Sequence, residues 1–283
     1  MGVLEEKILI FEPHPDDVAF QISGSVFKWI AEGREIMICT VTTGNNSTLD
    51  MNVTSNEIRE IMAKEHRNAM KFLGLDDDHI VQWNYNDLGL DPGRDRIPLL
   101  QDMVRLIRRY KPVTVITVDP KNVQNEENVD HRLVAMTGFE AAALAAYPNV
   151  FRKQLSEEGV DQHFVSRVLF YMTPEPDTFV DIGGVPLEKK IELGLIYDSQ
   201  LNLMQTEGIK RLEPLEVEFP AFKLPKEKVW PTICKEIAKE AAKIFRKLHP
   251  MRRNIQFAEA FRLKYLGVVD KLRDILPKSI KFK

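Results

Sequence analysis

Two histidines and several carboxylates occupy positions in this sequence where they could act together. His14, Asp16 and Asp17 follow an apolar run at residues 8–11, and His131 follows a later β-branched run. Two imidazoles and one carboxylate form a ligand set of catalytic zinc, which leaves one coordination position open for water. A second carboxylate beside that water could act as general base, and adjacent Asp16 and Asp17 could divide the two roles. A cation would also compensate the repulsion between these neighbouring charges.

Simpler interpretations of the same residues remain open. An Asp after a strand most often caps the following helix, and the His-x-x-Asp spacing of His14 and Asp17 is common by itself. His131 could equally be a structural histidine at a helix start. The two groups together favour a metal site more than either does alone, because they follow two strand ends that should meet. The other histidines have no paired acidic residue, and we interpret them as structural: His66, His79, His163 and His249.

The first half of the chain alternates between strand and helix patterns. Continuous apolar or β-branched runs predict strands, and apolar residues at helical intervals predict helices. The strands are expected at residues 8–11, 36–41, 80–83 and 113–118, and the helices at 18–31, 56–73, 98–111 and 132–146. This alternation predicts an α/β, Rossmann-like fold with a mostly parallel sheet and helices on both faces. In such a sheet, ligands bind at the carboxyl ends of the strands, where the strand order reverses.

The alternation breaks after Pro148. The elements expected in this part are strands at 167–173, 178–182 and 258–265 and helices at 187–197, 231–248 and 266–276. Four prolines between residues 214 and 231 predict an irregular excursion. We find no internal repeat and no linker, which predicts one compact domain over residues 1–283. Within it we expect an alternating core at about 1–200 and a C-terminal elaboration at about 201–283.

The composition excludes several classes of protein. The formal net charge of −3 gives no basic excess for neutralising phosphates, so we expect no nucleic-acid partner. Cys39 and Cys234, the only cysteines of the sequence, lie far apart, which excludes a Cys-based zinc framework and suits a reducing compartment. The apolar runs are too short for a signal peptide or a membrane span, so we expect a cytoplasmic protein with no membrane partner.

In these motifs the sequence resembles the PIG-L/LmbE family of zinc-dependent N-acetylglucosamine deacetylases, and within it the archaeal diacetylchitobiose deacetylase branch. Val18 stands where most of the family has Glu after His-Pro-Asp-Asp, as in that branch. The resemblance covers most of the chain in order. The matching segments are 14–17, 23–24, 65–74, 130–132, 199–200 and 259–262. The His-Pro-Asp-Asp and Asp-His-Arg motifs are the more specific of these.

The resemblance implies a function and a division of roles. His14, Asp17 and His131 would hold one Zn²⁺ per chain. Asp16 would be the base that activates water, and Asp130 would support the site from behind the ligands. The reaction implied is hydrolysis of an N-acetyl or related acyl group on an amino sugar such as N-acetylglucosamine or diacetylchitobiose. The partner implied is therefore a small-molecule amino sugar, and relatives suggest a homo-oligomer, a trimer or a hexamer.

Several positions depart from the family pattern. The family's oxyanion histidine is Tyr197 here, whose hydroxyl could donate to a developing oxyanion. Alternatively the ring packs against the sheet and the hydroxyl faces water. The substrate-binding positions that the resemblance carries over are Asn128, Thr43, Met62 and Asp87. The first three replace a histidine, an acidic residue and an arginine, in that order.

Two other classes of function remain open. Because the changed positions surround the substrate and spare the metal ligands, the chain could be a metal-retaining sugar-binding protein with altered or weak catalysis. An acidic pair after a first strand also occurs in receiver-like phospho-acceptor domains, although two convergent histidines suit zinc better than magnesium. Acetate release from N-acetylated amino sugars would separate the first alternative from an enzyme, and metal analysis would separate the second.

Overall fold

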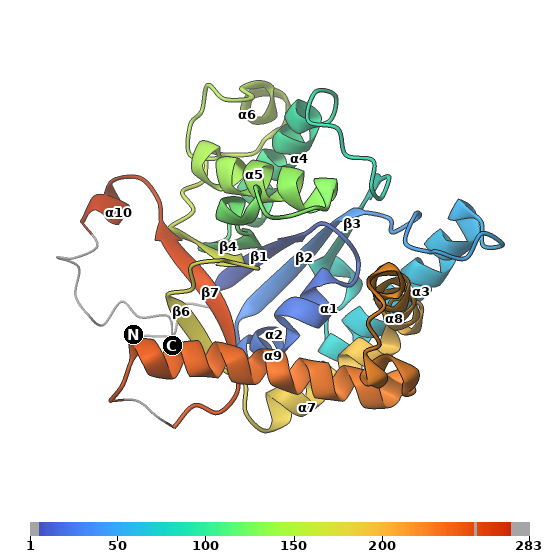
Figure 1. Ribbon diagram of the computed structural model, residues 1–283. Helices are drawn as coiled ribbons and strands as arrows, with labels where there is room; N and C mark the ends of the chain where they lie inside the picture. The colour runs from blue at the N-terminus through green and yellow to red at the C-terminus, as the bar shows by residue number, and fades with distance from the viewer. Residues whose placement is uncertain (1–5, 252–253, 273–283) are drawn as a thin grey trace.

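One mixed sheet of seven strands, in the order β3-β2-β1-β4-β5-β7-β6, forms the centre of the computed structural model, which describes residues 6–251 and 254–272 (Figure 1). The strands are β1 (Lys7–Glu12), β2 (Glu35–Thr42), β3 (Ile80–Tyr85), β4 (Thr114–Val118), β5 (Arg167–Tyr171), β6 (Thr178–Asp181) and β7 (Ala258–Tyr265). The strands from β3 to β5 run parallel, and β7 is antiparallel to both of its neighbours. The prediction of a mostly parallel sheet is therefore confirmed.

Helices cover both faces of this sheet (Figure 1). One face carries α4 (Arg96–Tyr110) and α5 (Val129–Leu144). The opposite face carries α1 (Asp17–Gln21), α2 (Ser23–Ala31), α3 (Ser55–Leu73), α7 (Val185–Ile196) and the long α9 (Lys226–Leu248). The remaining described α-helices are α6 (Lys153–Glu158), α8 (Asp198–Leu212) and α10 (Val268–Lys271). None of the helices in the described part of the chain is both long and apolar enough to cross a membrane.

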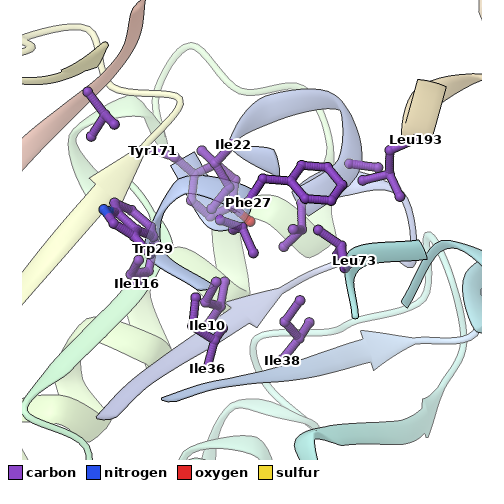
Figure 2. Packing of buried hydrophobic residues seen from close by; sticks show 14 of the residues in the cluster. Ile10, Ile22, Phe27, Trp29, Ile36, Ile38, Leu73, Ile116, Tyr171 and Leu193 are labelled. Carbon is purple, nitrogen blue, oxygen red and sulfur yellow. The ribbon is translucent and has the colours of Figure 1, made fainter. Parts of the chain in front are cut away.

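The central strands are buried on both faces, which explains their continuous apolar sequences. Along β1, Ile8 and Ile10 pack into the cluster beneath α2, α3 and α7. Figure 2 shows Ile10 in this cluster together with Trp29, which is fully buried. The alternate residues, Leu9 and Phe11, pack into a second cluster beneath α4 and α5. Successive side chains of a strand point to opposite faces, so one short run supplies both cores. This rigid double-sided packing holds the carboxyl ends of the strands in place.

The strand order reverses beside β1, which has β2 on one side and β4 on the other. The chain passes from β1 outward to β2 and β3, and then returns to β4 and β5. The carboxyl end of β1 leads into residues 13–17, and the carboxyl end of β4 leads through a loop into residues 128–131. Because β1 and β4 are parallel neighbours, both groups of residues reach the same edge, as the sequence predicted.

Several predictions of individual elements were incomplete. The helix expected at 18–31 is two helices, because Ile22 leaves helical geometry between α1 and α2 with φ −134° and ψ 8°. Helices α6 and α8 were not predicted. In α8 the buried residues are Gln200 and Leu201, which is too little burial to produce an apolar stripe. The terminal helix expected at 266–276 ends outside the described residues, and the described part contains the short α10.

Candidate metal centre

The turn after β1 carries the first group of site residues. The backbone N–H of Asp17 donates to the carbonyl of His14 at 3.3 Å, which closes a tight turn over residues 14–17. Asp16 occupies the third position with φ −105° and ψ −9°, close to the sparsely populated region where many active-site residues lie. A carboxylate oxygen of Asp17 accepts the N–H of His14 at 2.8 Å. The same turn therefore orients the side chain of Asp17, which begins α1.

Three side chains converge at the edge of the sheet. Nδ1 of His14 lies 3.1 Å from Nε2 of His131 and 3.3 Å from Oδ2 of Asp17. Oδ1 of Asp17 lies 3.3 Å from Nε2 of His131, and the candidate ligand atoms of all three residues lie within 4.8 Å of one another. With zinc–ligand bonds of about 2.0–2.1 Å, two ligands of a tetrahedral ion lie roughly 3.3 Å apart. The spacing of these atoms therefore fits a shared cation.

Two buried carboxylates lie behind His14. Its Nε2 is 3.1 Å from Oδ1 of Asp87 and 3.2 Å from Oδ2 of Asp130. Asp130 also accepts the backbone N–H of Leu88 at 2.6 Å and that of Leu90 at 3.1 Å. These contacts favour a proton on Nε2 of His14, which leaves the lone pair of Nδ1 to bind a cation. They also join the loop after β3 to the first turn of α5.

The start of α5 places His131. The side chain of Asn128 accepts the N–H of Asp130 at 2.9 Å and caps the helix, so that His131 lies in its first turn. Oε2 of Glu126 lies 3.2 Å from Nδ1 of His131, at an angle outside that of a regular hydrogen bond. A carboxylate at this position favours a proton on Nδ1 and a lone pair on Nε2. The two histidines thus turn opposite ring nitrogens toward the shared position.

The charges of the centre shift the pKa values of its members. Burial disfavours the charged imidazole of His14, but the surrounding carboxylates, Asp130 first among them, raise its pKa well above the ordinary value. Burial likewise disfavours the charged imidazole of His131. The negative charge of Asp17 outweighs burial there and raises the pKa of His131 to about 9. Although burial opposes ionisation of Asp17, the imidazoles of His131 and His14 hold its pKa well below the usual range. The metal-free centre therefore carries protons that a cation must displace.

Asp16 differs in environment from its neighbour Asp17. It is half-buried, and its side chain does not cap the helix that follows. Burial, followed by the negative charge of Asp17, raises the pKa of Asp16 to about 7. A carboxylate with a pKa near 7 can take up a proton and release it again at neutral pH. This is the property that a general base requires, and the role of Asp16 stays a prediction.

The structure places Met62 away from a substrate, and the substrate role of the other three expected contacts stays a prediction. Met62 is fully buried, with its sulfur 2.9 Å from the amide nitrogen of Gln200, so it cannot reach a substrate here. Asp87 lies against the imidazole of the first candidate ligand, and Asn128 uses its side-chain oxygen as a helix cap. Thr43 is 8% exposed and its hydroxyl donates within its own loop. These four residues build the walls and supports of the centre in this structure.

Tyr197 packs its ring into the core, as one of the two interpretations expected, but its hydroxyl does not face water. It is fully buried at the junction of α7 and α8, and its hydroxyl donates to the carbonyl of Pro15 at 2.5 Å. A hydroxyl has a single proton, so in this arrangement it cannot also donate to an oxyanion, and it does not face water. His66, which we had interpreted as structural, contacts the same hydroxyl through Nδ1 at 3.0 Å. Both side chains belong to the support of the His-Pro-Asp-Asp turn.

Sequence reasoning missed two carboxylates near the centre. Glu12 ends β1 fully buried, where it accepts the N–H of Val18 at 2.9 Å and contacts the hydroxyl of Thr40 at 2.6 Å. Burial raises its pKa to about 8. A carboxyl group in a buried strand was a visible signal, since an ionisable group is costly there without partners. Glu126, behind His131, gave no such signal, because it lies in a polar loop beside another glutamate.

Comparison with known proteins places these residues in a wider context. Residues 9–142 match the family described as PIG-L: GlcNAc-PI de-N-acetylase. This range contains each of the three candidate ligands. A diacetylchitobiose deacetylase of Thermococcus kodakarensis is 31% identical over 195 residues, which cover 69% of this chain and 70% of the relative.

Solved structures extend the likeness to nearly the whole chain. The N,N'-diacetylchitobiose deacetylase from Pyrococcus horikoshii aligns with a TM-score of 0.74 and 23% identity, over 97% of this chain and 88% of that chain. The 4-carboxy-2-hydroxymuconate hydratase of Pseudomonas putida KT2440 aligns with a TM-score of 0.60 and 17% identity, over 91% of this chain and 95% of that chain. At these identities the likeness concerns the fold alone.

Proposed function

Because the chain belongs to the PIG-L family, whose members include named deacetylases, we propose that it is a zinc-dependent N-deacetylase of amino sugars. Its substrate would carry an N-acetyl or related acyl group, as in N-acetylglucosamine or diacetylchitobiose. The observation that carries the proposal is the convergence of His14, Asp17 and His131 on one position, directly beside Asp16. An N-deacetylase needs a polarised carbonyl, an attacking water and a base at a single place.

The donor set suits zinc. Imidazole nitrogens favour zinc and other first-row transition metals, whereas magnesium and calcium prefer oxygen ligands throughout. Two imidazoles and one carboxylate are also the number and kind of protein ligands in catalytic zinc sites. These preferences argue against the receiver-like alternative, in which carboxylate oxygens would hold magnesium.

The residues of the chain can divide the reaction between them. When bound, zinc would polarise the acetamido carbonyl and lower the pKa of water. Asp16 takes the proton of the water whose oxygen attacks the carbonyl carbon, and later gives a proton to the nitrogen as the C–N bond breaks. Asp87 and Asp130 keep the proton of His14 on Nε2, away from the ligand position. The products are acetate and the free amine.

An acetate-release assay tests this proposal. Zinc-loaded protein is incubated with N-acetylglucosamine and diacetylchitobiose, and acetate is measured before and after removal of the metal with a chelator. We expect release that disappears with the chelator and returns when zinc is restored. Release that persists after complete metal removal would exclude a metal-dependent reaction. Zinc binding without any release would favour the sugar-binding alternative.

A matched pair of variants ties the activity to the centre. His131→Ala removes one candidate ligand and should abolish both zinc retention and acetate release. His163→Ala is the control, because His163 contacts the carbonyl of Pro112 at 2.7 Å at the opposite, amino-terminal edge of the sheet. The control should keep both properties. Equal loss in the two variants would show that the histidines act through stability alone.

A further inference from the structure

The carbonyl of Pro15, in the middle of the His-Pro-Asp-Asp turn, has two buried side-chain neighbours. The hydroxyl of Tyr197 lies 2.5 Å from this oxygen and Nδ1 of His66 lies 2.9 Å from it. Tyr197 is 0% exposed and His66 is 4% exposed, so water cannot substitute for either contact. His66 comes from α3 and Tyr197 from the junction of α7 and α8. Two distant parts of the chain therefore meet on one backbone oxygen.

The chemistry of the oxygen fixes the protons of both neighbours. A carbonyl oxygen can only accept, so Nδ1 of His66 must carry the proton and the hydroxyl of Tyr197 must point the same way. The imidazole is neutral, because burial lowers the pKa of His66 to about 4. Its Nε2 is then an acceptor, 3.1 Å from the hydroxyl of Thr40. The same hydroxyl lies 2.6 Å from a carboxyl oxygen of Glu12.

This arrangement controls the backbone of Asp16. The carbonyl of Pro15 and the N–H of Asp16 belong to one planar peptide group, so holding the carbonyl fixes that plane. Asp16 has φ −105° and ψ −9°, as the third residue of a tight turn does, so the plane of this peptide group sets the direction of its side chain. A carbonyl that accepts from two donors loses both bonds if the peptide rotates. The two donors therefore resist the motion that would reorient Asp16 and move Asp17.

From these contacts we propose that Tyr197 and His66 are a pair of positioning residues that hold the Pro15 carbonyl and thereby orient Asp16 and Asp17. The proposal rests on the proposed function in that Asp16 and Asp17 perform the base and ligand roles. It assigns Tyr197 a task different from oxyanion stabilisation. It also gives His66 a role that no spacing pattern in the sequence indicates.

The test compares Tyr197→Phe with the control Tyr110→Phe, and adds His66→Asn, His66→Leu and the double variant of Tyr197→Phe with His66→Leu. Tyr110 is a buried tyrosine at the amino-terminal edge of the sheet, packed beneath Lys7. Three measurements are made: hydrogen exchange of the Asp17 amide in metal-free protein, the affinity and absorption spectrum of bound cobalt, and kcat and KM for acetate release. Cobalt serves as a spectroscopic substitute for zinc, and the first two measurements need no turnover.

We expect Tyr197→Phe to speed exchange at Asp17 and to weaken cobalt binding about 10-fold, the lower end of the range for residues behind metal ligands. kcat should fall while KM changes little, because the hydroxyl does not touch substrate. His66→Asn retains a donor near the position of Nδ1, so alone it should have a smaller effect than His66→Leu. The double variant of Tyr197→Phe with His66→Leu should lose more than the sum of the single changes, since the carbonyl then keeps neither side-chain donor.

Two results would overturn the proposal. Tyr197→Phe could lower kcat about 10²–10³-fold with unchanged cobalt affinity, spectrum and exchange, which would make the hydroxyl a direct oxyanion donor. Alternatively, Tyr197→Phe and the double variant could match Tyr110→Phe in all three measurements, which would show that the contacts position nothing. Absence of acetate release from the parent would count against the proposed function only, because exchange and cobalt binding still decide the positioning role.

Discussion

Asp130→Asn tests whether the carboxylates behind the candidate ligands tune metal binding. Asp130 is fully buried and accepts from three donors: the backbone N–H groups of Leu88 and Leu90, and Nε2 of His14. Asparagine has nearly the same shape, but it offers one acceptor oxygen and places an NH₂ group where the second oxygen was. Whichever way the amide turns, at least one of the three donors faces another donor.

The structure sets the size of the effect. Oδ2 of Asp130 receives Leu88 and His14, while Oδ1 receives only Leu90, so the amide oxygen should take the place of Oδ2. The N–H of Leu90 then loses a bond to a charged acceptor, which costs about 1.5–3 kcal/mol in the free energy of unfolding. His14 keeps a hydrogen-bond partner, but that partner is now an uncharged amide. We expect zinc affinity to fall by roughly 10–100-fold, as it does when such outer partners are changed.

Two measurements separate these effects. Denaturant unfolding of the metal-free protein gives the loss of stability, and competition with a chromogenic chelator gives the zinc affinity. Asp119→Asn is the control: Asp119 is also fully buried, follows β4, and accepts from Nε of Arg262 at 2.7 Å. It should lose stability and keep its zinc affinity. The reasoning fails if both variants bind zinc equally well, or if Asp130→Asn binds as tightly as the parent.

Asp16→Asn should retain zinc and lower kcat by about 10²–10⁴-fold, the range for removal of a general base; unchanged acetate release would exclude that role. Zinc affinity should rise as the pH approaches 9, because binding displaces a proton from His131, whose pKa is raised to about 9. The stability of the metal-free protein should instead fall as the pH rises over the same range. Because the pKa of His131 is raised by folding, its contribution to stability is complete below pH 6.5 and is lost by about pH 9. An unfolding midpoint that stays level over this interval in the parent, or that falls equally in His131→Ala, would contradict this.

The fold was predictable where strands and helices carry strong patterns. β4, Thr114–Val118, is buried at every residue, and its β-branched sequence indicates such a strand directly. α8 was not predictable in this way, because its exposed surface shows no apolar stripe. Its position is determined by contacts at its start instead: Glu65 accepts the N–H of Ser199 at 2.9 Å and its hydroxyl at 2.6 Å. A contact between residues so distant in sequence has no local signal.

The same distinction applies to the candidate site. The meeting of His14 and His131 was predictable, because parallel neighbouring strands bring their carboxyl ends to one edge. The directions of Tyr197 and Met62 were not, because they depend on how α3 packs against the junction of α7 and α8. A family position gives the place of a residue in the chain. It does not give the face of the element on which the side chain lies.

Contacts between distant segments also explain why the matching motifs occur together. Glu259 accepts the N–H groups of Gly24 at 3.1 Å and Ser25 at 2.7 Å, and it pairs with Lys190 at 2.6 Å. A side chain at residue 24 would lie 3.1 Å from the same carboxylate, so the glycine allows this close approach. The motifs at 23–24 and 259–262 therefore form the two sides of one contact in the scaffold.

Such scaffold contacts cannot by themselves assign a reaction. A hydratase from Pseudomonas putida KT2440 shares this fold over 91% of the chain, so the arrangement of sheet and helices is compatible with more than one chemistry. The assignment of N-deacetylation therefore depends on the residues that could touch metal or water: His14, Asp17, His131 and Asp16. These residues lie in the turn before α1 and in the first turns of α1 and α5, at the edge where the strand order reverses, and the scaffold holds these segments. A change of reaction would need altered side chains there and no change in the sheet.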